Sequence, residues 1–217
     1  MEDGVLNASC RCLHRQVEAG LGDKGTLNVE ADDPMVIDVA YSQLLERTCC
    51  LANALKARGF KKDERVVIHL GMSFEGVTEM QTWARIDATR SVFVDGFSAQ
   101  SLRDRIAHTS AVMVITADER LRSGKQLLLK AIVGEALALD GCDSVKDVIN
   151  YQRTVGKVGR DNTREHWLHD EPKNHPATCE REWVAAEDLL FLPYTSGSTG
   201  KPKNVQHSTA ATCCTGR

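Results

Sequence analysis

The residues best suited to chemistry lie near the end of the sequence, where hydroxyls, glycines and lysines directly follow an apolar segment. Residues 188–192 have the composition of a buried strand, and the run beyond them contains Thr195, Ser196, Gly197, Ser198, Thr199, Gly200, Lys201, Pro202 and Lys203. Glycine adopts positive φ angles at no steric cost, so successive backbone N–H groups can converge on one point. The hydroxyls add donors and the lysines add positive charge. We therefore predict that this run binds a polyphosphate.

The spacing of the glycines separates this run from the P-loop of the common nucleoside triphosphatases. A P-loop has four residues between its two glycines, followed by Lys and then Ser or Thr. Here two residues separate Gly197 from Gly200, and Pro202 stands where the magnesium-binding hydroxyl would be. An ordinary turn or linker is the alternative, but linkers seldom follow a buried strand directly or carry two lysines beside a proline. The pattern favours a phosphate loop of a different kind and disfavours a kinase-like triphosphatase.

A second cluster of charge follows a predicted strand that ends near residue 116. It contains Arg120, Arg122, Ser123, Gly124 and Lys125. Cations after a strand, with a glycine at the start of a helix, are typical of anion sites. From the residue types alone, solvated surface charge is the better interpretation.

The elements that must position these residues alternate between helices and strands. Three-to-four-residue apolar spacing predicts helices over residues 41–58, 74–86, 98–108 and 125–139, the first capped by Ser42 and the third by Ser98. Runs rich in β-branched residues predict strands over residues 65–70, 91–94, 111–116 and 145–151. Such βαβ units indicate an α/β fold, a parallel sheet with flanking helices, whose ligands bind at the carboxyl ends of the strands.

Two stretches carry weaker signals. Residues 4–34 are mixed and polar, with faint helical periodicity over residues 12–19. Residues 152–182 are predicted to form a long surface excursion, in which His166, His169, His175 and Cys179 have no zinc-site spacing. A polar loop is therefore the better interpretation than a metal site, and the eight cysteines of the chain are interpreted as reduced thiols.

The composition excludes several classes of protein. The 217 residues are 42% hydrophobic and carry a net charge of −3 with both signs interspersed, which gives no reason to expect a nucleic-acid or anionic-membrane partner. No apolar run approaches the roughly 20 residues of a membrane span. The first residues lack a secretory or mitochondrial leader pattern, so we expect a cytoplasmic protein.

Residues 192–203 resemble, position by position, the phosphate-loop signature of the acyl-adenylate-forming (AMP-binding) enzymes. Residues 186–203 and 41–70 are most similar to the acetyl-CoA synthetase branch, the AMP-forming acetate–CoA ligases. The resemblance implies an N-terminal segment over residues 1–40 and an incomplete AMP-binding domain over residues 41–217. It also places Arg122 and Lys125 where two basic residues of that branch contact the nucleotide phosphate of CoA.

The activity implied by the resemblance has two half-reactions with ATP, acetate and CoA as substrates. Acetate attacks the α-phosphate of ATP, and the CoA thiol then displaces AMP from acetyl-adenylate. The 195–203 run would steady the β- and γ-phosphates, while Mg²⁺ would enter with ATP and find its ligand elsewhere. No catalytic side chain is assigned in this stretch. The resemblance covers about the first third of a complete enzyme, so we expect a fragment that is inactive alone and self-associates through exposed apolar surface.

Two alternatives stay open: another short-chain acyl-CoA synthetase, such as a propionate–CoA ligase, and a non-catalytic nucleotide-binding, CoA-binding or interaction fragment. Four departures from the family pattern bear on them. Asp87, Asp95 and Asn204 replace glycines, and Pro193 replaces an apolar residue, where it would remove a backbone donor if the strand continued through it.

Overall fold

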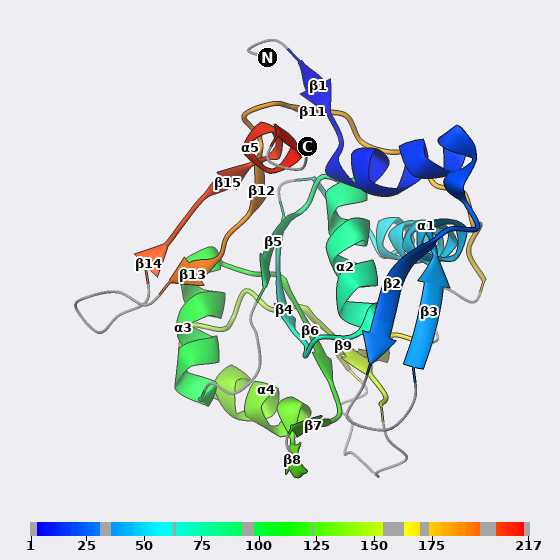
Figure 1. The fold of residues 1–217 in the computed structure, drawn as a ribbon. Coiled ribbons are helices and arrows are strands. Elements are labelled where there is room, and N and C mark those ends of the chain that lie inside the picture. Colours follow the sequence, from blue (N-terminus) through cyan, green and yellow to red (C-terminus); the bar gives the residue numbers. More distant parts are fainter. Residues whose placement is uncertain are drawn as a thin grey trace.

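The computed structural model shows strands packed between two pairs of helices (Figure 1). It describes residues 4–30, 36–62, 64–92, 98–122, 124–153, 163–169, 174–195 and 203–214. Within these ranges no helix is both long enough and apolar enough to cross a membrane.

The main sheet has seven strands in the order β10-β9-β6-β4-β5-β12-β15. Every neighbouring pair is parallel except β12 and β15. The strands in chain order are β4 (Arg65–His69), β5 (Thr89–Val92), β6 (Met113–Ala117), β9 (Asp147–Tyr151), β10 (Glu165–Trp167), β12 (Leu189–Phe191) and β15 (His207–Ser208). The predicted α/β class and its parallel sheet are confirmed.

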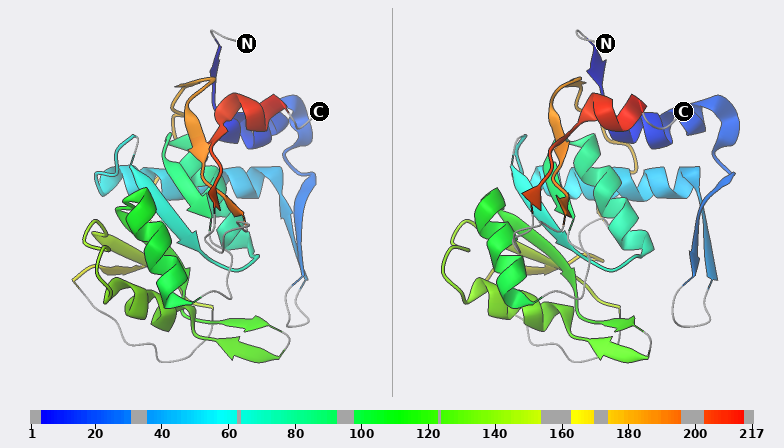
Figure 2. Two further views of the ribbon diagram at one scale, coloured as in Figure 1. Left: turned by 90° about the vertical axis from the view of Figure 1, so that its left-hand side faces the viewer. Right: turned by 60° about the vertical axis from the view of Figure 1, so that its left-hand side comes forward.

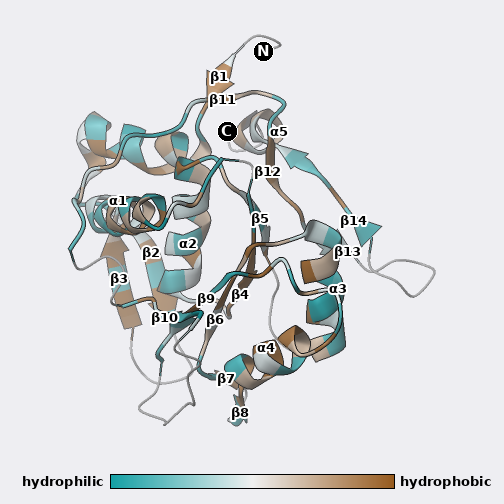
Figure 3. Ribbon diagram, turned by 180° about the vertical axis from the view of Figure 1, so that it is seen from behind, coloured by the Kyte–Doolittle hydropathy of each residue, from teal (hydrophilic) through white to brown (hydrophobic). Residues whose placement is uncertain are grey.

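Helices cover both faces of the sheet. Figure 2 shows α1 (Tyr41–Ala57) and α2 (Phe74–Arg85) on one side, with α3 (Ala99–Thr109) and α4 (Leu129–Leu137) on the other. Alternate residues of β4 serve the two layers: Ile68 packs with α1 and α2, whereas Val67 packs with α3 and α4. Both side chains are at most 1% exposed, and the central strands form an apolar layer in Figure 3. Burial on both faces is why these strands read as continuous apolar runs.

The predicted helices are present, with two errors at their starts. Ser98 caps α3 as expected, its Oγ accepting a bond of 3.3 Å from the Ser101 N–H. Ser42 does not cap α1, because the cap is Ala40, whose N–H donates to Gln43 Oε1 at 2.9 Å. The helix expected from residue 125 begins at Leu129, since β7 (Arg120–Arg122) and β8 (Lys125–Leu127) form an antiparallel hairpin first.

The N-terminal residues contain more structure than their composition indicated. The helical turns η1 (Cys10–His14) and η2 (Val17–Leu21) agree with the faint periodicity. The hairpin of β2 (Gly25–Glu30) and β3 (Val36–Ala40) has no partner outside itself in its sheet, and it was not expected. β1 (Val5–Leu6) pairs with β11 (Val184–Ala185), which joins segments far apart in sequence.

Part of residues 152–182 belongs to the sheet, so a surface excursion was the wrong interpretation for it. β10 pairs in parallel with β9 and becomes the sheet edge, although its three residues are too few for a periodicity signal. Further along, Asn53 Nδ2 donates 2.9 Å bonds to the carbonyls of Pro176 and Thr178, which ties this stretch to α1.

The departures from the family pattern have distinct structural consequences. Asp87 has φ +55° at the end of α2, a conformation that suits glycine. Pro193 lies beyond the end of β12, where its carbonyl accepts a 3.0 Å bond from the Val205 N–H, so no ladder donor of β12 is lost. Asn204 lies in the strand β14 (Lys203–Asn204). Asp95 lies outside the described residues.

Candidate nucleotide-binding site

The ends of the predicted phosphate loop are brought together by a pair of short strands. β13 (Tyr194–Thr195) follows β12 and pairs in antiparallel fashion with β14, with Thr195 opposite Lys203 and Tyr194 opposite Asn204. The Thr195 and Lys203 side chains are both exposed. The remaining predicted loop residues lie outside the described part of the chain: Ser196, Gly197, Ser198, Thr199, Gly200 and Lys201. The structure thus places the two ends of the run beyond the carboxyl end of a parallel strand.

The strand β12, which leads toward the loop, is held by its neighbour in the sheet, β5. The Leu192 N–H donates to the Arg90 carbonyl at 2.9 Å, and Ser91 Oγ donates to the Leu192 carbonyl at 3.2 Å. The Arg90 guanidinium lies 5.6 Å from the centre of the Phe191 ring, and that ring stacks on His207 with centres 4.6 Å apart. Burial lowers the pKa of Arg90 to about 10, so the side chain stays charged at neutral pH beside Phe191 of β12.

Helix α3 holds β13 from the side. The Tyr194 hydroxyl and His108 Nδ1 are 2.7 Å apart, and the Arg105 guanidinium lies 4.8 Å from the centre of the Tyr194 ring. Burial raises the pKa of Tyr194 and the Arg105 charge partly offsets this, so the phenol is neutral at physiological pH. Burial lowers the pKa of Arg105, whose Nη1 donates to the Ser101 carbonyl at 2.9 Å.

A cleft of about 330 Å³ adjoins the paired strands. Its lining includes two arginines, a histidine and one carboxylate from α3, together with Tyr194 and Asn204. The carboxylate of Asp104 is bound by Arg103 at 2.9 Å, so the cleft keeps an excess of hydrogen-bond donors and positive charge. Such a lining favours an anionic ligand beside the loop.

The second charged cluster is a hairpin rather than a helix start. The register places the backbones of Arg122 and Lys125 opposite each other, and Gly124 turns the chain with φ +74°. The Lys125 side chain is exposed. Ser123 and the Arg122 side chain lie outside the described part of the structure. The two residues assigned to CoA are therefore neighbours across a tight turn.

The base of this hairpin is fixed by a buried carboxylate after β6. Asp118 is 1% exposed, and its Oδ1 accepts bonds from the backbone N–H groups of Glu119 at 2.7 Å and Arg153 at 2.9 Å. Gln126 of β8 donates to the Glu119 carboxylate. The next side chain, Arg120, crosses so close to Gly71 that an added Cβ would lie 2.6 Å from its Cδ.

Both candidate sites follow the carboxyl ends of parallel strands in one sheet. The loop follows β12 and the hairpin follows β6, and the sheet order sets β4 and β5 between them. Three strand spacings of about 4.8 Å put the two strand ends roughly 14 Å apart. One edge of the sheet therefore carries both, as expected for a fold that binds ligands beyond its strand ends.

Sequence reasoning missed the residues that hold the strand β13, which leads into the predicted loop. Tyr194 directly precedes the predicted run, and Arg105 and His108 lie three residues apart on one helix face, but nothing local connects them. Two of the histidines that the sequence offered make other contacts: His166 Nε2 lies 3.2 Å from Asp147 Oδ1, and the His169 ring lies 5.8 Å from that of Trp167. Within the described ranges no group of three or more His, Cys, Asp or Glu side chains could hold a metal ion.

The parallel sheet with helices on both faces defines an α/β domain, and the two candidate sites follow the carboxyl ends of its strands. Comparison with known proteins identifies the family of this domain. The family model described as "AMP-binding enzyme" matches residues 26–216, and the chain belongs to that family.

Curated relatives narrow the similarity. The chain is 52% identical over 208 residues to an acetyl-coenzyme A synthetase of Paraburkholderia phymatum, and 55% identical over 208 residues to one of Cupriavidus taiwanensis. It is 54% identical over 209 residues to that of Burkholderia mallei. Each match covers 96% of this chain and 32% of the relative, so the chain spans about a third of their length.

Proposed function

We propose that the chain supplies the ATP-phosphate loop and part of the CoA site of an AMP-forming acetate–CoA ligase. In this reaction an acetate oxygen attacks the α-phosphate of ATP, which releases pyrophosphate and leaves acetyl-adenylate. The thiolate of CoA then attacks the acetyl carbon, forms the thioester and releases AMP. The proposal rests on the family membership and on the similarity to acetyl-coenzyme A synthetases over nearly the whole chain.

The structural observation that carries the proposal is the pairing of Thr195 with Lys203 directly beyond β12. It joins the ends of a run rich in hydroxyls, glycines and lysines at the edge where such sheets bind ligands. Lys203, with Ser196, Gly197, Ser198, Thr199, Gly200 and Lys201, would neutralise and hold the departing β- and γ-phosphates. Because negative charge builds on phosphate, positioned donors at this point lower the barrier.

The hairpin of β7 and β8 supports the second part of the proposal. Arg122, Ser123, Gly124 and Lys125 would bind the nucleotide phosphate of CoA from the turn. Lys125 provides charge without the two-pronged fork of an arginine. Mg²⁺ would accompany ATP, but the described residues contain no cluster of acidic side chains to hold it, so no ligand is assigned to it here.

Further parts of the proposal concern the chain as a whole. We expect residues 1–40 to form a family-specific N-terminal segment and residues 41–217 to form the nucleotide-binding unit. Small molecules, namely acetate, ATP and CoA, are the expected partners, in the cytoplasm. Exposed apolar side chains such as Met72, 77% exposed, and Val36, 55% exposed, are consistent with the expected self-association.

Calorimetric titration of the 217-residue chain with Mg-ATP and with CoA tests the proposal. Lys203→Ala is expected to weaken ATP binding about tenfold and leave CoA binding unchanged, because a charge-assisted hydrogen bond is lost at one site only. Lys125→Ala is expected to do the reverse. Lys146→Ala is the matched control, since its side chain is 70% exposed at the opposite edge of the sheet.

Two results would contradict this assignment. The first is that neither Mg-ATP nor CoA shows saturable binding. The second is that Lys203→Ala and Lys125→Ala change the binding of either ligand no more than Lys146→Ala does. Pyrophosphate release in the presence of acetate, ATP and CoA measures separately whether turnover accompanies binding.

A further inference from the structure

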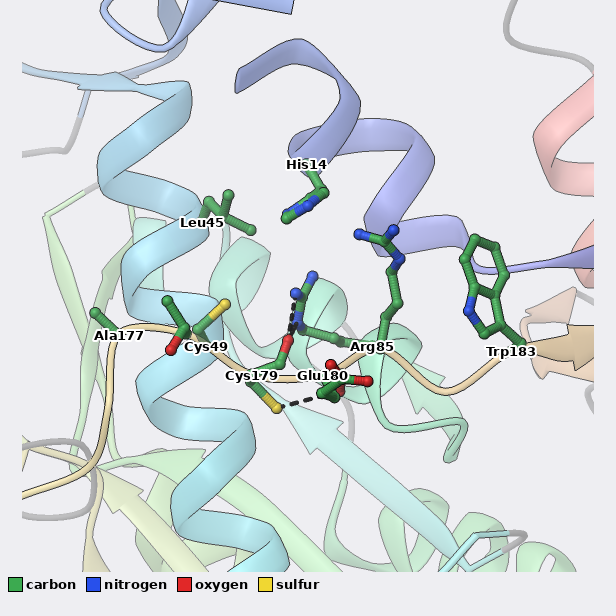
Figure 4. Close-up of a pocket in the computed structure, with 10 residues that line it drawn as sticks. His14, Leu45, Cys49, Arg85, Ala177, Cys179, Glu180 and Trp183 are labelled. Carbon is green, nitrogen blue, oxygen red and sulfur yellow. Dashed lines mark hydrogen bonds between the residues drawn. The ribbon is translucent and has the colours of Figure 1, made fainter. Parts of the chain in front are cut away.

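Another cavity lies on the side of the sheet that α1 and α2 cover, and no residue of the loop or the hairpin lines it. It has a volume of about 420 Å³ and is bordered by α1, by η1 and by the segment of residues 177–183 (Figure 4). Arg85, the last residue of α2, forms the inner wall of the cavity. It precedes β5 in the chain and so lies toward the amino end of that strand. The cavity therefore belongs to neither candidate site described above.

The inner wall presents a buried cation with an unused donor. Arg85 is 2% exposed, and its Nε and Nη2 both donate to the Cys179 carbonyl, at 3.0 and 2.5 Å. Its Nη1 is buried and has no hydrogen-bond partner among the residues that the structure describes. In Figure 4 the guanidinium lies between the Cys179 carbonyl and the His14 ring. A buried guanidinium N–H without a partner costs free energy unless a ligand accepts its hydrogen bond.

The other walls suit an anion attached to an apolar body. Arg181 and Trp183 both line the cavity, with the guanidinium 5.1 Å from the centre of the indole ring. His14 lies opposite Arg85, with its Nε2 3.1 Å from Glu18 Oε1. Its buried Nδ1 has no hydrogen-bond partner within the described part of the chain. Leu45, Cys49 and the indole provide apolar surface.

The charges around the cavity favour a negative guest. Two arginines line it against one carboxylate, that of Glu180. The neighbouring Glu182 is bound by Lys56 at 2.7 Å. Burial raises the pKa of the Cys49 thiol, with Arg85 opposing the effect, so the thiol is neutral and adds no competing charge.

We propose that this cavity binds a small organic anion whose carboxylate or phosphate group accepts hydrogen bonds from Arg85 Nη1 and Arg181. The apolar part of the ligand lies against Leu45 and Trp183. The volume is within the range of small-molecule sites, which combine apolar walls with a few converging polar groups. The site is independent of the nucleotide-binding assignment, because none of its residues belongs to the loop or the hairpin.

The test is to titrate the full 217-residue chain separately with phenyl phosphate, benzoate and phenol. Tryptophan fluorescence reports binding in each titration. Phenyl phosphate and benzoate are expected to saturate the signal, and phenol is not. Trp183→Phe should abolish the fluorescence change, since the other tryptophans do not line the cavity. Arg85→Lys and Arg181→Gln are each expected to weaken binding about tenfold, whereas Arg15→Gln, an exposed arginine at another cleft, should not.

Arg181→Gln keeps the test valid if Arg85→Lys fails to fold, because Arg181 lies at the partly exposed rim. Lys203→Ala should bind the probes normally, which separates this cavity from the phosphate loop. The proposal is overturned if neither anion saturates, if phenol binds as well as phenyl phosphate, or if Arg181→Gln binds both anions like the unmodified chain.

Discussion

Asp87 occupies a backbone conformation that favours glycine, and replacing it measures the cost of that conformation directly. It follows α2 with φ +55°, where a residue with a Cβ loses about 1–2 kcal/mol. Its carboxylate lies 2.7 Å from Lys62 Nζ, in an ion pair whose lysine side chain is 53% exposed. Solvent screening limits such a pair to about 0–1 kcal/mol of stability.

Two substitutions at Asp87 separate these contributions. Asp87→Gly relieves the backbone strain, but it removes the ion pair and adds the entropy cost of a glycine, about 0.5–1 kcal/mol, so the free energy of unfolding should change by no more than about 1 kcal/mol. Asp87→Ala removes the same side-chain contacts and keeps the strain. We therefore expect the alanine variant to be about 1 kcal/mol less stable than the glycine variant, which corresponds to about 2–4 °C in Tm for a chain of this size.

Thermal and urea unfolding followed by circular dichroism measure this difference. Ala138 is the matched control, because it also ends a helix but has φ −81°. Ala138→Gly should lower stability by about 0.5–1 kcal/mol. Alanine is thus expected to be the more stable residue at position 138, whereas glycine is expected to be the more stable one at position 87. Equal stability of the two Asp87 variants would refute the reasoning, since it would show that the position carries no left-handed strain in solution.

Three further predictions concern buried contacts. Burial and the nearby Glu75 carboxylate raise the pKa of Tyr151 to about 12; stability should therefore fall as pH rises from about 10 to 12, because the unfolded state loses its proton first. Glu75→Gln should lower the phenol pKa measured by ultraviolet titration. Gly71→Ala should cost about 1–3 kcal/mol, since its Cβ would meet Arg120, and Arg120→Ala in the same chain should restore most of the loss on urea unfolding. Asn7→Asp should destabilise more than Asn7→Ala, because the amide donates to three backbone carbonyls at 2.8–3.2 Å that would repel a carboxylate; calorimetric melting of both variants checks the order, and an equal loss would contradict it.

The local sequence pattern was sufficient to predict features that depend on a single helix or strand. The cap at Ser98 and the buried residues Leu102 and Ile106 follow from spacing within a single helix. The parallel strands β4 and β6 follow from short apolar runs that are buried on both faces. The position of the run predicted to bind phosphate, directly after such a strand, was likewise readable, because glycines, hydroxyls and lysines are adjacent in the chain.

Contacts between distant segments were not readable, because each partner looks ordinary by itself. β10 has three residues of mixed polarity and becomes a strand only because β9 offers it an open edge. The helix predicted from residue 125 begins only at Leu129, because Gly124 turns the chain with a positive φ and residues 125–127 pair in the β7–β8 hairpin.

The sequence by itself determined the α/β class and the order of the central elements, and it carries the prediction that the run near its end binds phosphate. Only the tertiary structure decided what holds the strand β13, which leads into that run: Tyr194 contacts His108, 86 residues away, and Arg105. It also decided that Arg85 keeps a buried donor facing a cavity. The physical reason is that periodicity records whether a side chain is buried, whereas the partner it meets is set by how separate elements pack.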